Sequence, residues 1–376
     1  MLDQLAMRAT STTETHVDAL IVGAGFGGIY QLYALRQLGL SVQVIDLAGD
    51  VGGTWYWNRY PGPHVHTPFF ASLSDPSAGA MSDTESFVYR FTWDKEDLQT
   101  YPWTHHYIQG PDVLQYLEHV VERHDLRKHM AFNTELLSAE WSEPEKLWNV
   151  DVSTGIRYKV KYLITALGLL SRQNYPDIPG IDTFKGLKCH TAAWDERIEL
   201  KDKRVGVIGC GSTGVQVITA IAKTVKELVC FSRHPQYSVP SGDRPVTPEY
   251  RQMVNANYDK IDQVRNSAYG FGFQESTRSF NEFTPEEREA IFEELWKQGN
   301  GFRFLGGGFN DVSRHSLPPV SDTIGPPRSS TPRQIIKQQN AINSMLTGCR
   351  LPPIELPMLQ RANSSGKRSS RLYLIQ

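Results

Sequence analysis

Two stretches of the chain repeat one pattern of apolar and glycine-rich segments. In the first, the apolar run Val17–Val22 predicts a strand, a glycine turn follows at 23–28, and a helix and a second strand continue to Asp46. In the second, an apolar strand precedes a glycine turn at 209–214, and the following helix leads to a strand that ends at Arg233. Each stretch is a predicted β-α-β unit, and two such units predict an α/β fold.

The first glycine turn has the spacing of a dinucleotide-binding loop. Gly23 would permit the tight turn, Gly25 would let the backbone approach a pyrophosphate, and Gly28 would let the helix pack on the strand. The helix N-terminus offers N–H groups to the phosphates. Asp46 lies 23 residues after Gly23, where a carboxylate can accept a hydrogen bond from a ribose 2′-hydroxyl. The agreement of strand, turn, helix and acid favours a nucleotide site over a purely structural turn.

The second turn has Gly209, Gly211 and Gly214 in the same order, so both units are predicted to be Rossmann-like domains. Its second strand ends at Arg233, 24 residues after Gly209, where the first unit has an acid. A guanidinium at this place can pair with a 2′-phosphate, which favours NADP over NAD or FAD. The alternative for Arg233 is a solvated charge at the end of a strand.

Two nucleotide units of opposite ribose preference indicate two cofactors with electrons passing between them. FAD in the first unit and NADPH in the second is the natural pairing, since NADPH delivers a hydride and a flavin can react with dioxygen. A disulfide reductase would need a CxxC or CxxxxC pair near the flavin. The four cysteines lack that spacing and are expected to be inert free thiols: Cys189, Cys210, Cys230 and Cys349.

Composition limits the class of protein further. The 376 residues, 40% of them hydrophobic, can form two domains. With 39 Lys and Arg against 41 Asp and Glu, the formal charge of −2 gives no support for a nucleic acid or a membrane surface as partner. Residues 1–16 lack the apolar core of a signal peptide and are expected to be flexible, and no run approaches about 18 apolar residues. A cytoplasmic location is therefore expected.

The segment FKGLKCHTAAWD, residues 184–195, joins the two units and follows neither helical nor strand spacing. Four of its residues resemble the fingerprint of the type I Baeyer-Villiger monooxygenases: Phe184, Gly186, His190 and Trp194. Three further segments are similar to that family: GGTWYWNRYPG at 52–62, SDTESFVYRF at 82–91 and ITALGLLS at 164–171. Trp194 makes the resemblance specific to this family. The similar flavin N- and S-oxidising monooxygenases usually have Tyr or Phe at the position of Trp194.

The resemblance implies an activity and roles for particular residues. The family uses FAD, NADPH and O₂ to insert one oxygen atom next to a ketone carbonyl, which gives an ester or a lactone. By match to the family, Asp83 would hold a catalytic arginine, and His190 and Trp194 would couple NADP binding to domain movement. Without the resemblance, Asp83 reads equally as a turn or N-cap residue, His190 as a structural histidine and Trp194 as a core anchor.

Further cofactor contacts follow from the same resemblance. They are expected at Gly53, Thr54 and Trp55 for the flavin, and at Ser212, Thr213 and Gln216 for the pyrophosphate of NADP. No metal site is predicted, because His64 and His66 stand in a proline-rich stretch without a third ligand.

Two segments depart from the family pattern. Residues 63–79 are not needed by it, and they would form a surface loop, displace Asp83 from the flavin, or come from an unspliced intron. The stretch 312–376 has nine Lys or Arg, two acids, eight prolines and ten serines, which predicts a disordered tail. The resemblance implies a last FAD-domain segment and a catalytic arginine beyond the matched part, and neither is recognisable in this sequence.

The predicted organisation follows the order of the chain: an FAD-binding domain at 17–170 with the insert 63–79, an NADP-binding domain at 171–311 with the linker 184–195 and a helical part, and the tail 312–376. The clearest helix follows Thr284 as N-cap, with Pro285 at its first position and Glu287 completing a capping box. Two other functions stay open, namely a flavin N- or S-oxygenase and a truncated nucleotide-binding chain without catalysis.

Overall fold

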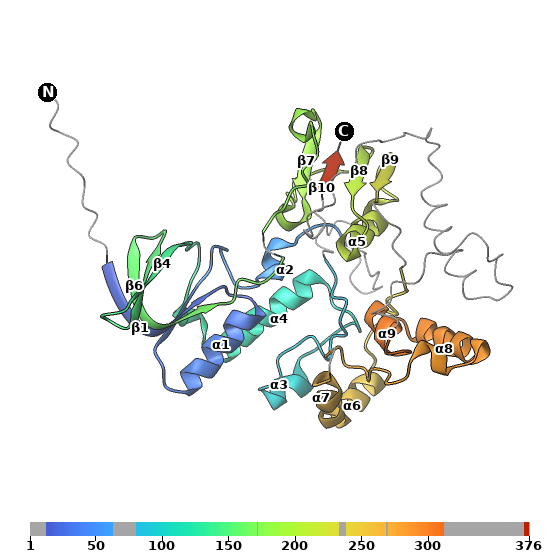
Figure 1. Cartoon of the computed structure of the whole chain (residues 1–376), viewed down its shortest axis with the longest axis horizontal. Coiled ribbons are helices and arrows are strands. Elements are labelled where there is room, and N and C mark those ends of the chain that lie inside the picture. Colours follow the sequence, from blue (N-terminus) through green and yellow to red (C-terminus); the bar gives the residue numbers. More distant parts are fainter. Residues whose placement is uncertain are drawn as a thin grey trace. The chain divides into compact units, whose positions relative to one another are not determined.

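The computed structural model describes residues 13–62, 80–170, 172–232, 238–267 and 270–311, together with the backbone of 372–375. The predicted insert 63–79, Arg233 and nearly all of the predicted tail lie outside these residues. The described residues contain a six-stranded and a four-stranded sheet with helices, so the predicted α/β fold is confirmed (Figure 1).

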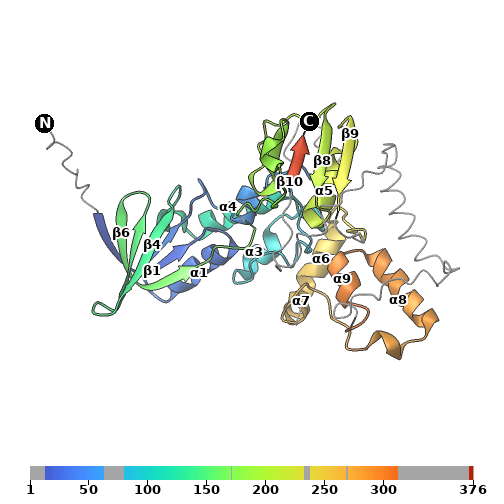
Figure 2. The ribbon, with the colours of Figure 1, turned by 45° about the horizontal axis from the view of Figure 1, so that its top comes forward.

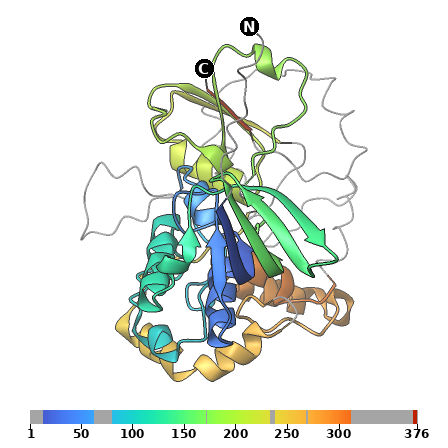
Figure 3. The ribbon, with the colours of Figure 1, turned by 90° about the vertical axis from the view of Figure 1, so that its left-hand side faces the viewer.

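The six-stranded sheet has the order β3-β2-β1-β6-β5-β4. Its strands are β1 (Thr13–Val22), β2 (Val42–Ile45), β3 (Met130–Ala131), β4 (Leu136–Ser142), β5 (Leu147–Val152) and β6 (Ile156–Thr165). β1 is parallel to β2 and to β6, with Ile21 opposite both Val44 and Ile164, whereas β4, β5 and β6 form an antiparallel meander. Figure 3 shows the blue and green strands of this sheet side by side. The first predicted β-α-β unit is therefore present as β1, α1 (Phe26–Gln37) and β2.

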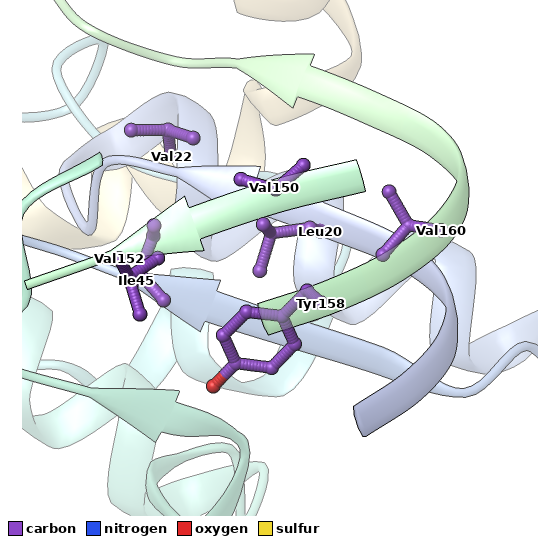
Figure 4. Packing of buried hydrophobic residues seen from close by; sticks show 7 residues of the cluster. All are labelled: Leu20, Val22, Ile45, Val150, Val152, Tyr158 and Val160. Atoms are coloured by element: carbon purple, nitrogen blue, oxygen red, sulfur yellow. The ribbon is translucent and has the colours of Figure 1, made fainter. Parts of the chain in front are cut away.

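A cluster of buried hydrophobic side chains forms the core at this sheet. Figure 4 shows seven of its buried side chains: Leu20, Val22, Ile45, Val150, Val152, Tyr158 and Val160. Two further helices belong to the same part of the chain, α2 (Thr54–Trp57) and α4 (Gly110–Arg123), together with the 3-10 turn Arg127–His129. α4 buries Val113, Leu117, Val120 and Val121, the three- and four-residue spacing of an amphipathic helix.

The four-stranded sheet has the order β7-β10-β8-β9. Its strands are β7 (Leu187–His190), β8 (Arg204–Ile208), β9 (Glu227–Phe231) and β10 (Leu372–Ile375), and α5 (Ser212–Ile221) joins β8 to β9. β8 and β9 are parallel, as the second β-α-β unit requires, and β10 is antiparallel to both β7 and β8 (Figure 2). The prediction of a disordered tail is therefore wrong for residues 372–375, because the gap between two strands gives their backbone groups partners.

The remaining helices belong with this second sheet in the chain's contact pattern. They are α3 (Lys95–Thr100), α6 (Pro248–Ala256), α7 (Tyr258–Arg265), α8 (Pro285–Gln298) and α9 (Gly301–Gly306). Short 3-10 turns occur at Ile181–Thr183, Thr191–Ala193 and Phe280–Glu282. The predicted capping box of α8 is confirmed: the Thr284 hydroxyl accepts from the Glu287 N–H at 3.2 Å, and the Glu287 carboxylate accepts from the Thr284 N–H at 2.8 Å.

Contacts divide the chain into two compact units that do not follow the order of the sequence. Unit 1 holds the described residues up to Tyr60, with Gly110–Gln173 and Thr191–Glu196. Unit 2 holds the other described residues, including 80–109. The segment 80–109, which sequence order assigns to the first domain, thus makes its contacts with the second. No helix in the described parts of the chain has the length and apolar character needed to cross a membrane.

Candidate nucleotide and active sites

The glycines of the first turn are required by their surroundings. Gly23 has φ of +113°, and a Cβ there would lie 2.4 Å from the Ala166 carbonyl oxygen. A Cβ at Gly28 would lie 1.8 Å from the Gly23 carbonyl oxygen. Gly25 is the N-cap of α1, has no side chain to cap the helix, and is followed by a first turn without acidic residues. The N-terminus of α1 is thus left for an external anion, as expected for a pyrophosphate site.

Asp46 follows β2 directly and is held against the same turn. Its carboxylate accepts hydrogen bonds from the N–H groups of Ala24 at 2.6 Å and Ala48 at 2.8 Å. These bonds fix the carboxylate at the carboxyl end of the sheet, beside the loop that carries Gly23. A contact of Asp46 with a ribose hydroxyl stays a prediction, and the observed position is the one it requires.

The segment GGTW lies against the first glycine turn. A Cβ at Gly53 would be 2.9 Å from the Gly25 Cα, so the two backbones approach as closely as only glycine permits. Thr54 and Trp55 begin α2; Thr54 is half-buried, and Trp55 is 8% exposed. The structure therefore brings Gly53 and its neighbours to the turn predicted for the flavin cofactor, although Trp55 also serves as a core residue.

The second turn repeats the construction of the first. Gly209 has φ of +102°, and a Cβ at Gly214 would lie 2.3 Å from the Gly209 carbonyl oxygen. Gly211 is the N-cap of α5, which begins with Ser212 and Thr213 and has no acidic residue in its first turn. The N–H of Gly209 donates to the carbonyl of Phe231 at 2.9 Å, just as the N–H of Gly23 donates to that of Ile45 at 2.8 Å. Both turns are consequently closed onto the end of the second strand.

Gln216 lies on the buried side of α5 rather than at its open end. Its side-chain amide accepts a hydrogen bond from the Met81 N–H and donates one to the Met81 carbonyl, both at 3.0 Å. The contact with the pyrophosphate that was expected for Gln216 stays a prediction, and the observed partner is a different one.

Asp83 lies in a short turn held by its neighbours. The Ser82 N–H donates to the Ile108 carbonyl at 2.9 Å, and the Ser82 hydroxyl accepts from the Thr84 N–H at 3.1 Å. Ser82 is buried whereas Asp83 is exposed, so the turn presents its carboxylate at the surface of unit 2. A carboxylate on a turn whose main chain is held in this way can bind a cation, and the catalytic role of Asp83 stays a prediction.

A buried ion pair that sequence reasoning missed lies two residues beyond Asp83. The Glu85 carboxylate accepts from the Arg303 guanidinium at 3.0 Å and from the Tyr107 hydroxyl at 3.2 Å. The side chain of Glu85 is 8% exposed and that of Arg303 is 17% exposed. Burial and the Glu85 charge raise the pKa of Tyr107, which stays a neutral donor. The three residues wall a cavity of 330 Å³ that His106 and Arg244 also line.

His106 gives this cavity wall a dependence on pH. Burial, followed by the charges of Arg244 and His105, lowers the pKa of His106 from 6.5 to about 4. The unfolded chain therefore binds a proton near pH 6.5 while the folded protein does not, so stability should fall as the pH drops from 6.5 toward 4. We expect urea unfolding to show this loss, and the loss should be smaller in His106→Gln. An equal loss in both proteins would contradict the assignment.

The linker fingerprint spans the boundary of the two units. His190 ends β7 in unit 2, is 7% exposed and packs its ring 5.4 Å from that of Tyr175. Trp194 belongs to unit 1, where Glu196, two residues later, forms a 3.4 Å ion pair with Arg59 of the GGTWYWNRYPG segment. His190 is thus buried in unit 2 and Trp194 belongs to unit 1, and their coupling role stays a prediction.

Arg233 lies outside the described residues, two positions after the end of β9 at Phe231. If it binds the 2′-phosphate, Arg233→Ala should weaken NADPH binding far more than NADH binding, by about 1.5 to 3 kcal/mol. Titration with both nucleotides measures the difference. Arg204→Ala, at the start of β8, is the control, because Arg204 pairs with Glu227 at an exposed site. Equal losses for NADPH and NADH would contradict the assignment.

The described residues contain no group of three or more His, Cys, Asp or Glu placed to hold a metal ion, and His64 and His66 lie outside them. Cys189, Cys210 and Cys230 are free thiols, and burial raises the pKa of Cys230 to about 11.

Comparison with known proteins places these turns in a family. The pyridine nucleotide-disulphide oxidoreductase family matches residues 20–290. A Baeyer-Villiger monooxygenase of Pseudooceanicola batsensis is 46% identical over 306 residues, which cover 81% of this chain and 53% of that protein. A phenazine N-monooxygenase of Lysobacter antibioticus is 44% identical over 302 residues, or 80% of this chain and 53% of that one.

The fold of this chain also matches a solved structure. The crystal structure of cyclohexanone monooxygenase from Rhodococcus sp. Phi1 bound to NADP⁺ matches with a TM-score of 0.72 and 51% identity, over 80% of this chain and 54% of that one. The chain belongs to the pyridine nucleotide-disulphide oxidoreductase family. Within it, the predicted resemblance to the Baeyer-Villiger monooxygenases is confirmed, and the chain spans about half the length of the curated relatives it matches.

Proposed function

We propose that the protein acts in an FAD- and NADPH-dependent Baeyer-Villiger oxygenation of a ketone. The observation that carries the proposal is the pair of glycine turns, each closed onto its second strand and each opening a helix without a cap or an acid. Two such turns fit two dinucleotides. The relatives and the cyclohexanone monooxygenase structure supply the reaction class.

The two units would bind different cofactors. In unit 1, the N–H groups at the start of α1 would hold the pyrophosphate of FAD, and Asp46 would bind its ribose. In unit 2, Ser212 and Thr213 would hold the pyrophosphate of NADPH, while Asp83 would hold the cation that stabilises negative charge near the ketone. FAD, when bound, would supply the reaction with dioxygen that side chains cannot provide.

The overall reaction consumes a ketone, O₂, NADPH and a proton, and it gives an ester or lactone, NADP⁺ and water. In the purified protein, a flavin spectrum and NADPH oxidation that is faster with a cyclic ketone would support the proposal, and ¹⁸O₂ should leave one labelled atom in any lactone formed. Because no catalytic arginine is recognisable in this sequence, we expect these 376 residues to retain flavin poorly and to oxidise NADPH mainly with hydrogen peroxide as product. A chain that binds neither FAD nor NADPH would contradict the proposal. The same proposal includes a small ketone and dioxygen as substrates and a cytoplasmic location for the protein.

A second candidate is N-oxygenation, which the 44% identity to a phenazine N-monooxygenase favours. Trp194 in the linker favours the Baeyer-Villiger reaction. The same assay with a phenazine in place of the ketone separates the two, because only an N-oxygenase converts it to the N-oxide.

A further inference from the structure

Met81 and Gln216 exchange two hydrogen bonds across unit 2. The Met81 N–H donates to Gln216 Oε1 and Gln216 Nε2 donates to the Met81 carbonyl, both at 3.0 Å, between residues 135 positions apart. Gln216 is 8% exposed. A side-chain amide that pairs with both main-chain groups of one residue fixes that residue as a neighbouring strand would.

The position of this pair connects two predicted sites. Gln216 is four residues after Ser212, about one helical turn from the end of α5 that would hold NADP. Asp83 follows Met81 by two residues, and between them the buried Ser82 donates to Ile108 at 2.9 Å. The predicted NADP loop is therefore connected to the loop that carries Asp83 through the first helical turn of α5 and the side-chain amide of Gln216.

We infer that Gln216 is a positioning residue that ties the Asp83 turn to α5, so that NADP⁺ bound at 209–214 orders residues 81–84. The inference rests on the proposed function in one respect, since it takes the second turn as the NADP site. A nucleotide that steadies the first turn of α5 also steadies Gln216, and through it the main chain of Met81. By linkage, the order of this turn must strengthen nucleotide binding by the same factor.

Amide hydrogen exchange at Met81, measured by NMR on the flavin-free chain, tests the pair directly. In Gln216→Leu the Met81 N–H loses its acceptor, and its exchange should become about 3- to 10-fold faster. Gln216→Glu keeps an acceptor oxygen for the Met81 N–H but loses the donor to the Met81 carbonyl, so it should restore only part of the protection. Thr219→Val is the matched control, because Thr219 is exposed on the same helix and its hydroxyl donates to the Val215 carbonyl at 2.7 Å. The Ala166 N–H of unit 1, which donates to the Val22 carbonyl at 2.8 Å, serves as the internal reference.

Adding NADP⁺ separates positioning from a merely structural role. In the unsubstituted chain NADP⁺ should slow the exchange of Met81, and in Gln216→Leu it should not. Unchanged Met81 exchange in Gln216→Leu, or equal slowing by NADP⁺ in both proteins, would overturn the inference. Because no flavin or ketone is present, a failure to form lactone leaves this result intact. Should Gln216→Leu not fold, protection of Met81 in Gln216→Glu that no longer responds to NADP⁺ would overturn the inference as well.

Discussion

Gly28→Ala is expected to destabilise unit 1 by about 3 kcal/mol or more, because the new Cβ meets main chain that cannot move aside. The Cβ would lie 1.8 Å from the Gly23 carbonyl oxygen and 3.6 Å from the Ile21 side chain. Relief requires α1 to shift away from β1, which would also move the helix N-terminus from the pyrophosphate position. Urea unfolding measures the loss of stability, and flavin retention measures the loss of the site.

Gly27→Ala is the matched control for this experiment. Gly27 precedes Gly28 in α1, but a Cβ there would be 3.8 Å from the Ala166 Cβ, an ordinary contact. Alanine also has a helix propensity about 1 kcal/mol better than glycine. Gly27→Ala should therefore be neutral or stabilising, and equal stability of the two variants would contradict the packing argument.

The two glycine turns could be predicted from the sequence because each is a local feature. The spacing of Gly23, Gly25 and Gly28, the apolar strand before them and the acid after the second strand all fall within one stretch of chain. The capping box at Thr284 was predictable for the same reason, since its partners are three residues apart. Local chemistry of this kind needs no knowledge of the fold.

The long-range pairs had no comparable signal. Glu85 and Arg303 are 218 positions apart, and Met81 and Gln216 are 135 apart, so only the folded chain brings them together. The assignment of 80–109 to the first domain followed the order of the chain, whereas its contacts lie in unit 2. The strand 372–375 could not be predicted from the composition of the tail. That composition is an average over residues 312–376, most of them polar, and the four residues that pair contribute little to it.

Glu85→Gln is expected to cost about 3 kcal/mol or more, since it leaves the Arg303 guanidinium without its carboxylate in a largely buried place. The amide can still accept from Tyr107, so the loss measures mainly the missing charge. The variant should also loosen the turn of Asp83, two residues earlier. Chemical denaturation gives the free energy of unfolding.

The exposed pair of Asp182 and Lys188 supplies the control, because its carboxylate is 95% exposed at 3.1 Å from the ammonium group. Asp182→Asn should cost less than about 1 kcal/mol. In the double variant Glu85→Gln with Arg303→Met, no buried charge is left unpaired, so part of the lost stability should return. Two outcomes would show that charge does not hold α9 to the Asp83 turn. In the first, Glu85→Gln lowers the free energy of unfolding no more than Asp182→Asn does. In the second, the double variant loses as much stability as Glu85→Gln and Arg303→Met lose together as single variants.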